Sequence, residues 1–168
     1  MPARCRLRRL AGTNSFFGGL TVLYFWGAAV FVLLVDQVSK YLVRLYMVPG
    51  RLHAVWPPIF YLTYVRNPGA AFGFLSRWPV LSVAVAFLVI PAAVFIRQRF
   101  FTSEPLVSAA LGLVMGGAVG NLVDRLARGV VTDFLDFRIW PVFNLADSAI
   151  VLGVGIIVWW LWQKEGKS

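Results

Sequence analysis

The sequence predicts an all-α integral membrane protein with four transmembrane helices. Two compositional facts support this fold class: 60% of the 168 residues are hydrophobic, and the mean hydropathy is +0.76. Only 14% of the residues are charged, whereas a soluble domain carries roughly 25%. In addition, four apolar stretches each approach the roughly twenty residues that cross a bilayer. We therefore expect residues 1–168 to form a single membrane domain.

The first expected span covers about residues 16–35. The arginine-rich segment before it is also typical of a cleaved signal peptide, but the apolar stretch is longer than an ordinary signal-peptide core and no small-residue cleavage site closes it. We interpret it as a retained helix. The other spans are expected at about residues 78–96, 105–123 and 143–162, and Pro91 predicts a kink in the second span.

The segment between the first two spans contains the predicted β structure. Residues 59–66 (IFYLTYVR) are rich in β-branched and aromatic side chains, and they are bounded by Pro58 and by Asn67-Pro68-Gly69. This composition predicts a short strand or hairpin arm within a β region of about residues 51–73.

The 16 Lys and Arg residues, which give a net charge of +9, flank the apolar spans. Such positions are typical of contact with anionic lipid headgroups, so we expect no nucleic-acid partner. Four crossings place both termini on one side of the membrane. Each side then holds eight Lys and Arg residues, but those beside the termini lie in shorter segments and closer to the spans, which favours cytoplasmic termini.

Polar side chains interrupt the apolar pattern where three of the spans begin or end, in pairs three or four residues apart that share a helical face. The pairs are Asp36 with Lys40, Asn121 with Asp124, and Asn144 with Asp147. By the alternating topology, all three fall on one membrane face together with Asn67 and Asp133. Five of the seven acidic residues lie there. Carboxylates near hydrocarbon are costly and tend to mark function.

These features also have purely structural interpretations. The structural alternatives are an ion pair that ends a helix (Asp36 and Lys40), a buried pair (Asp124 and Arg125), a helix cap (Asn144 and Asp147) and a solvated loop carboxylate (Asp136). The stripe of Gly112, Gly116 and Gly120 is typical of close helix packing. Because the polar groups gather on one face, the sequence still favours a functional site there.

Two carboxylates held close together can hydrolyse a peptide bond without a metal. Both cannot ionise comfortably, so one stays protonated. The ionised group takes a proton from water, the protonated group polarises the scissile carbonyl, and neighbouring Asn and Arg side chains stabilise the developing oxyanion. The residues alone leave three alternative partners for Asp147, namely Asp124, Asp133 and Asp136.

Other chemistries lack their motifs. The Gly-x-Gly-Asp of presenilin-type aspartyl proteases and the Gly-x-Ser-Gly of rhomboid proteases are absent. His53 and Cys5 are the only histidine and cysteine, which argues against a zinc site. A small transporter or channel is the main alternative from another class, but it should place polar groups at mid-membrane, where these spans are almost purely apolar. A structural scaffold is a third alternative.

Five stretches of the sequence, in this order, resemble the lipoprotein signal peptidase (signal peptidase II) family. They are residues 36–40 (DQVSK), 67–73 (NPGAAFG), 120–125 (GNLVDR), 131–134 (VTDF) and 143–148 (FNLADS). The resemblance covers roughly residues 17–162. Two features depart from the family: Pro68 stands where Thr or Ser is usual, and the segment between residues 133 and 147 is short.

The resemblance implies a bacterial inner-membrane enzyme with four transmembrane helices, a small β-sheet cradle on the outer face and an active site near that face. Its substrate would be a prolipoprotein with diacylglycerol on its lipobox cysteine, cut on the amino side of that cysteine. The catalytic pair of the family matches Asp133 and Asp147. Its supporting residues match Asn67, Gly69, Asn121, Asp124, Arg125 and Asn144, with Asp36 and Lys40 at the polar end of the first helix. We expect a monomer without cofactor or metal.

Overall fold

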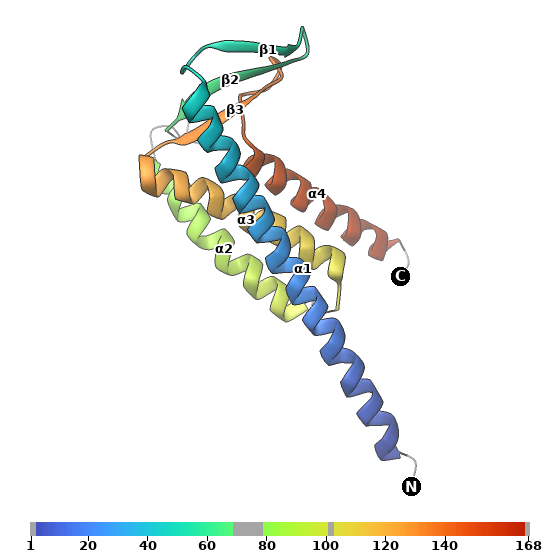
Figure 1. The fold of residues 1–168 in the computed structure, drawn as a ribbon. Coiled ribbons are helices and arrows are strands. Elements are labelled where there is room, and N and C mark those ends of the chain that lie inside the picture. The colour runs from blue at the N-terminus through green and yellow to red at the C-terminus, as the bar shows by residue number, and fades with distance from the viewer. Residues whose placement is uncertain (1–2, 69–78, 101–102, 167–168) are drawn as a thin grey trace.

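The structure, a computed structural model, describes residues 3–68, 79–100 and 103–166 (Figure 1). Within these ranges the chain forms four helices and one three-stranded sheet. The helices are α1 (Ala3–Tyr46), α2 (Pro79–Phe100), α3 (Pro105–Arg128) and α4 (Leu145–Glu165), and the strands are β1 (Leu52–Trp56), β2 (Phe60–Asn67) and β3 (Val131–Asp136). All four helices are long and apolar enough to cross a membrane, which confirms the predicted fold class.

Helix α1 does not end where its apolar run ends. It continues past residue 35, where we expected the first span to stop, and reaches Tyr46. One reason is the ion pair of Asp36 and Lys40, in which Oδ2 and Nζ lie 2.8 Å apart and both side chains are fully buried. Because the two residues are one turn apart, their charges compensate within the helix. The ion-pair interpretation is confirmed, whereas its position at a helix end is wrong.

Helix α3 is the central element of the bundle, since most of its residues are buried and it packs against the other three helices. Gly116 lies against the backbone of Ala29 in α1, and Gly117 lies against Ala146 in α4. A Cβ atom at either glycine would overlap the carbonyl oxygen opposite. Glycines of α3 are therefore packing residues, as the small-residue stripe predicts.

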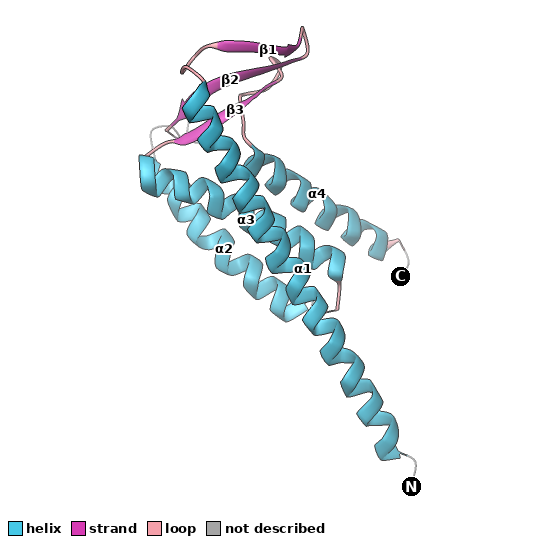
Figure 2. Ribbon diagram, in the orientation of Figure 1, coloured by secondary structure: helices cyan, strands magenta, loops and turns pink. Residues whose placement is uncertain are grey.

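The sheet is antiparallel with the strand order β1-β2-β3 (Figure 2). Strand β2 corresponds to the predicted strand at residues 59–66, but β3 comes from the segment after α3 and was not predicted. Gly129 makes this connection possible, because its left-handed backbone (φ 73°) caps α3 and turns the chain directly into β3. After β3 the short segment turns back, so that Phe143 forms an antiparallel bridge with Leu135 of β3, and the chain then enters α4.

The sheet stands on one end of the helical bundle, and both chain termini lie toward the other end (Figure 1). A small apolar cluster of Val43, Tyr64 and Phe134 joins α1 to strands β2 and β3. Because side chains alternate along a strand, Phe134 faces this cluster and its neighbour Asp133 faces the opposite side. The contact between sheet and bundle thus decides which way Asp133 points.

Candidate active site

The polar side chains selected from the sequence meet in a pocket between the sheet and the adjacent ends of α3 and α4. The pocket has a volume of about 260 Å³. Its lining residues are Asn67, Asn121, Arg125, Val131, Asp133, Trp140, Pro141, Val142, Phe143 and Asp147. Five of the ten candidate residues therefore line it. Another four are buried: Asp36, Lys40, Asp124 and Asn144. The tenth candidate, Gly69, lies outside the described residues.

Asp133 is 2% exposed and is held by two carboxamides. In the sheet it lies opposite Val65, so Asn67 is its diagonal neighbour on the same face. Asn67 Nδ2 donates to Asp133 Oδ2 at 2.8 Å, and Asn144 Nδ2 donates to Oδ1 at 2.6 Å. Burial raises the pKa of Asp133 to about 6, the hydrogen bond from Asn67 opposes this rise, and the charge of Asp147 adds to it.

Asp147 is oriented by the start of α4. Asn144 is the N-cap: its Oδ1 accepts the Asp147 N–H at 2.9 Å, while Asp147 Oδ2 accepts the Asn144 N–H at 3.3 Å. This reciprocal arrangement is a capping box. Asp147 Oδ1 accepts a further hydrogen bond of 2.8 Å from Asn121 Nδ2. The helix-cap interpretation is confirmed, and the cap itself holds the Asp147 carboxylate at the pocket.

Asn121 and Asn144 connect the two aspartates to each other and to α1. Asn144 Nδ2 donates to Asp133 and also to Asn121 Oδ1, the latter at 3.1 Å. Asn121 Oδ1 accepts a second hydrogen bond, of 2.8 Å, from Lys40 Nζ. The carboxylates are therefore bonded to neutral donors, which orient them without cancelling their charge, and the cation lies one residue further away.

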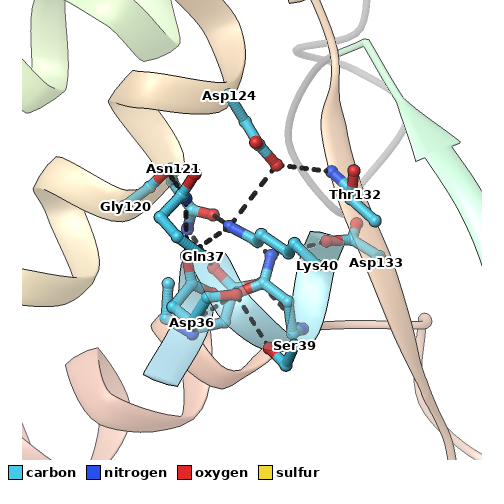
Figure 3. A network of polar contacts seen from close by, with 12 residues as sticks. Asp36, Gln37, Ser39, Lys40, Gly120, Asn121, Asp124, Thr132 and Asp133 are labelled. Carbon is cyan, nitrogen blue, oxygen red and sulfur yellow. Dashed lines mark hydrogen bonds and ion pairs between the residues drawn. The ribbon is translucent and has the colours of Figure 1, made fainter. Parts of the chain in front are cut away.

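The Asp36–Lys40 ion pair of α1 forms hydrogen bonds with both α3 and α4 (Figure 3). Asp36 Oδ1 accepts the Ala146 N–H at 3.0 Å, a backbone donor of the first turn of α4 that has no partner within its own helix. Gln37 Nε2 donates to Gly120 O in α3 at 3.0 Å and to Asp36 Oδ2 at 3.1 Å. The ends of α1, α3 and α4 are thus joined by side chains of α1.

Asp124 joins the helices to β3. It is fully buried and forms ion pairs with Lys40 (3.6 Å), Arg44 (3.4 Å) and Arg128 (3.1 Å). Its Oδ2 also accepts the Thr132 N–H at 3.0 Å, as Figure 3 shows. Since Thr132 immediately precedes Asp133, this bond fixes the strand next to the site. Asp124 is therefore a structural carboxylate beside the pocket.

From the sequence, Arg125 could have been the partner of Asp124 in a buried structural pair, but its side chain lies at the pocket instead. It lines the pocket, its Nη1 donates to Asn121 O at 3.3 Å, and its charge acts on Asp133 and Asp147 as well as on Asp124. Among the described residues, no hydrogen-bond partner reaches its buried Nε. A guanidinium in this position is available to a polar group that enters the pocket.

The interpretation of Asp136 as a solvated loop carboxylate is wrong. It lies in β3, is 3% exposed and accepts hydrogen bonds from Thr63 Oγ1 (2.8 Å) and from Arg138 N (2.8 Å) and Nη1 (3.2 Å). Burial acts to raise the pKa of Asp136, but these hydrogen bonds outweigh burial, and the pKa is lowered. Asp136 thereby holds the turn at Arg138, whose backbone is left-handed (φ 64°), from which the loop over the pocket starts.

Sequence reasoning missed three residues that hold the site: Gln37, Arg44 and Thr132. Arg44 donates to Thr132 Oγ1 at 3.1 Å and pairs with Asp124. A signal for Arg44 was present, because it lies four residues after Lys40 and eight after Asp36, on the same helical face. It was overlooked because the first span was expected to end near residue 35.

An apolar cavity of about 640 Å³ adjoins the site. It shares Trp140, Phe143 and Asp147 with the polar pocket and continues along α4 to Val151 and Leu152. Both of these residues are exposed on α4. In the part of the chain that the structure describes, no three His, Cys, Asp or Glu side chains are grouped as a metal ion would require.

Comparison with known proteins gives a consistent result. The model of a family described as signal peptidase (SPase) II matches residues 28–163. The lipoprotein signal peptidase of Pelotomaculum thermopropionicum is 50% identical over 137 residues, which are 82% of this chain and 90% of the relative. That of Moorella thermoacetica is 48% identical over 140 residues, or 83% and 93%. A solved bacterial membrane enzyme (in meso method, 2.3 Å) is similar with a TM-score of 0.81 and 32% identity, covering 89% of this chain and 92% of that one.

Proposed function

Since the chain belongs to the signal peptidase II family, we propose that it is an aspartyl endopeptidase in which Asp133 and Asp147 are the catalytic pair. Membership in this family indicates a multi-pass bacterial membrane protein that cleaves the signal peptides of prolipoproteins. The substrate that we propose carries diacylglycerol on its lipobox cysteine, and the cut lies on the amino side of that cysteine.

The observation that carries this proposal is the pocket with both aspartates at its wall. Of the four carboxylates near the sheet, Asp124 and Asp136 have their oxygens occupied by cations and backbone donors. Asp133 and Asp147 are bonded to amide groups and line the same space. A water molecule and a scissile carbonyl that enter this space would therefore meet both carboxyl groups.

The proposed reaction needs one proton on the pair. The ionised carboxylate takes a proton from the attacking water, and the protonated one gives its proton to the carbonyl oxygen. Collapse of the tetrahedral intermediate breaks the C–N bond: the carboxyl group that took the proton from water gives it to the leaving amine, and a hydroxyl of the intermediate returns a proton to the other carboxylate as the C=O bond re-forms. The pair is then back in its starting state. Arg125, which faces both aspartates, supports the developing negative charge on the oxygen.

The apolar cavity beside Asp147 supports a lipid-linked substrate. Its walls are almost entirely apolar, and it runs along a helix surface that would face hydrocarbon. Apolar chains of the substrate would lose no hydrogen bonds there and would remain shielded from water. We further propose that the termini are cytoplasmic, that the sheet and the pocket lie near the outer face of the inner membrane, and that the enzyme acts as a monomer.

The test is cleavage of a diacylglyceryl-modified prolipoprotein by the purified protein in detergent, with the unmodified precursor as a second substrate. The wild type should release the signal peptide from the modified substrate only. Asp133→Asn and Asp147→Asn should each abolish cleavage while thermal unfolding shows a folded protein. Glu104→Gln is the matched control, because Glu104 pairs with Lys164 far from the sheet, and it should cleave like wild type. Cleavage by either aspartate variant at the wild-type rate would reject the pair.

A further inference from the structure

Lys40 is a fully buried cation that lies outside the pocket yet is linked to one aspartate of the pair. It is 0% exposed and does not belong to the pocket lining. Its ammonium contacts Asp36 Oδ2 at 2.8 Å, Asn121 Oδ1 at 2.8 Å and Asp124 Oδ2 at 3.6 Å (Figure 3). Burying a cation is costly, and the ion pairs with Asp36 and Asp124 do not explain why one of the three contacts is a neutral amide.

The contact with Lys40 determines which way the Asn121 carboxamide faces. An ammonium group can only donate, so the amide oxygen must face Lys40 and the NH2 group must face the other way. Asn144 Nδ2 donates to the same oxygen and requires the same orientation. The Asn121 NH2 is consequently directed at Asp147 Oδ1, at 2.8 Å. A carboxylate oxygen accepts this bond best when it is ionised.

The two aspartates therefore experience different surroundings. Asp147 is half-buried, lies at the positive end of α4 and receives donors from Asn121 and from the Asn144 backbone. Asp133 lies in β3, is almost fully buried and is bonded to the two carboxamides of Asn67 and Asn144. The other charged groups around the pair are Asp36, Lys40 and Arg44 of α1 and Asp124, Arg125 and Arg128 of α3.

On the basis of the proposed function, we propose that Lys40 is a positioning residue. Through the Asn121 carboxamide it directs a hydrogen-bond donor at the Asp147 carboxylate, and it thereby assigns the proton of the pair to Asp133. Asp147 is then the group that takes a proton from water, and Asp133 is the group that protonates the carbonyl oxygen. The raised pKa of Asp133 agrees with this assignment.

The first test removes the cation without leaving a buried carboxylate unpaired. In Asp36→Asn/Lys40→Met both partners of the ion pair are neutral, a change that buried pairs often tolerate. The low-pH limb of the kcat/KM profile should move upward by about one pH unit, which is about a tenfold loss below the limb. KM should stay within about twofold, since Lys40 does not line the pocket. Asp36→Asn alone, which retains Lys40, is the matched control and should not move the limb upward.

The second test locates the proton without using activity. Infrared difference spectra between pH 5 and pH 7 should contain the C=O band of a titrating protonated carboxyl group. The band should disappear in Asp133→Asn and persist in Asp147→Asn. The infrared measurement does not need the double variant, so it still tests the proton assignment if that variant does not accumulate in a folded form.

The outcomes separate this inference from the proposed function. If the wild type cleaves and needs both aspartates, but the double variant loses rate without any movement of the low-pH limb, Lys40 is merely structural. Loss of the infrared band in Asp147→Asn instead of Asp133→Asn reverses the proton assignment. Failure of the wild type to cleave a lipidated prolipoprotein rejects the proposed function, and the infrared result still decides where the proton lies.

Discussion

The side-chain amide of Asn144 lies 2.6 Å from Asp133 Oδ1, so the residue that caps α4 also holds an aspartate of β3. Its side-chain oxygen caps the helix by accepting the Asp147 N–H, and its side-chain nitrogen donates to Asp133 at the pocket. One side chain thus couples the first turn of a membrane helix to the strand that carries the other carboxylate of the pair. The two functions of Asn144 can be separated by substitution.

Asn144→Ser should cap α4 but not support Asp133. Serine is as good an N-cap as asparagine, whereas alanine at this position costs about 0.5–2 kcal/mol of stability. We expect Asn144→Ser to unfold close to the wild-type temperature and yet to cleave about tenfold more slowly, because leaving a buried acceptor without its donor costs roughly 1–3 kcal/mol. Asn144→Ala should lose both properties. Equal cleavage by Asn144→Ser and wild type would show that the amide does not support Asp133.

Asp133→Asn should be more stable than the wild type at neutral pH. Burial raises the pKa of Asp133 from 3.8 to about 6, so the folded state disfavours the ionised carboxylate, and the penalty is complete above about pH 6 and absent below about pH 4. After allowing for one misdirected amide donor, we expect a gain on the order of 2 kcal/mol at pH 7.5. Thermal unfolding in detergent at pH 7.5 and pH 4 measures it. A gain that is larger at pH 4 would contradict the assignment.

Cleavage should fall on the alkaline side of the pH profile. The pair needs one proton, and Asp133, whose pKa is raised to about 6, holds it below that pH. As the pH rises through this value the proton is lost, so kcat/KM, which reports the free enzyme, should decline. The measurement is kcat/KM from pH 4.5 to 8.5 in an uncharged detergent. A constant value from pH 5 to 8 would exclude a proton on this carboxyl group.

Asp136→Asn should cleave nearly like the wild type, in contrast to the change at Asp133. The partner of Asp136 in the ion pair, Arg138, is 56% exposed, and such pairs contribute about 0–1 kcal/mol. Asparagine also retains an oxygen that can accept the Thr63 hydrogen bond. We expect less than about a fivefold change in kcat/KM. Complete inactivation of Asp136→Asn with the fold intact would place Asp136 among the catalytic groups.

Gly116→Ala should destabilise the bundle, whereas Gly155→Ala should not. A Cβ atom at Gly116 would lie 2.5 Å from Ala29 O, which belongs to the backbone of α1 and cannot turn aside. We expect a loss of about 1–3 kcal/mol from overpacking. No atom lies within 4 Å of the corresponding position at Gly155, so alanine there should be neutral or slightly stabilising. Thermal unfolding of the two variants side by side checks this, and equal stability would contradict the packing.

Much of this fold could be predicted because lipid imposes a simple rule. A chain that crosses hydrocarbon must satisfy its backbone in helices, so long apolar runs alone indicated four spans, and each is now a helix. The polar groups could likewise be assigned to one end of the bundle, because alternating topology leaves no other arrangement. The helix cap at Asn144 could also be predicted, because it depends only on neighbouring residues: Asn144 and Asp147 have the three-residue spacing of a capping box.

Other features depend on contacts between segments that are distant in the sequence. Strand β3 forms because β2 offers it a partner, and the pairing of Val65 with Asp133 then places Asn67 beside the carboxylate. Helix α1 continues through Asp36 and Lys40 because α3 and α4 supply partners for both side chains. Local patterns contain no information about such partners.

The sequence by itself therefore determined the membrane fold, the polar end of the bundle and, through resemblance, a candidate pair of aspartates. Only the tertiary structure decided that Asp124 and Asp136 are occupied by structural partners while Asp133 and Asp147 face a shared pocket. The physical reason is that a carboxylate has the same chemistry wherever it lies in the sequence. Its burial, its hydrogen-bond donors and the charges around it are set by residues from other elements, and these surroundings distinguish a candidate catalytic group from a structural one.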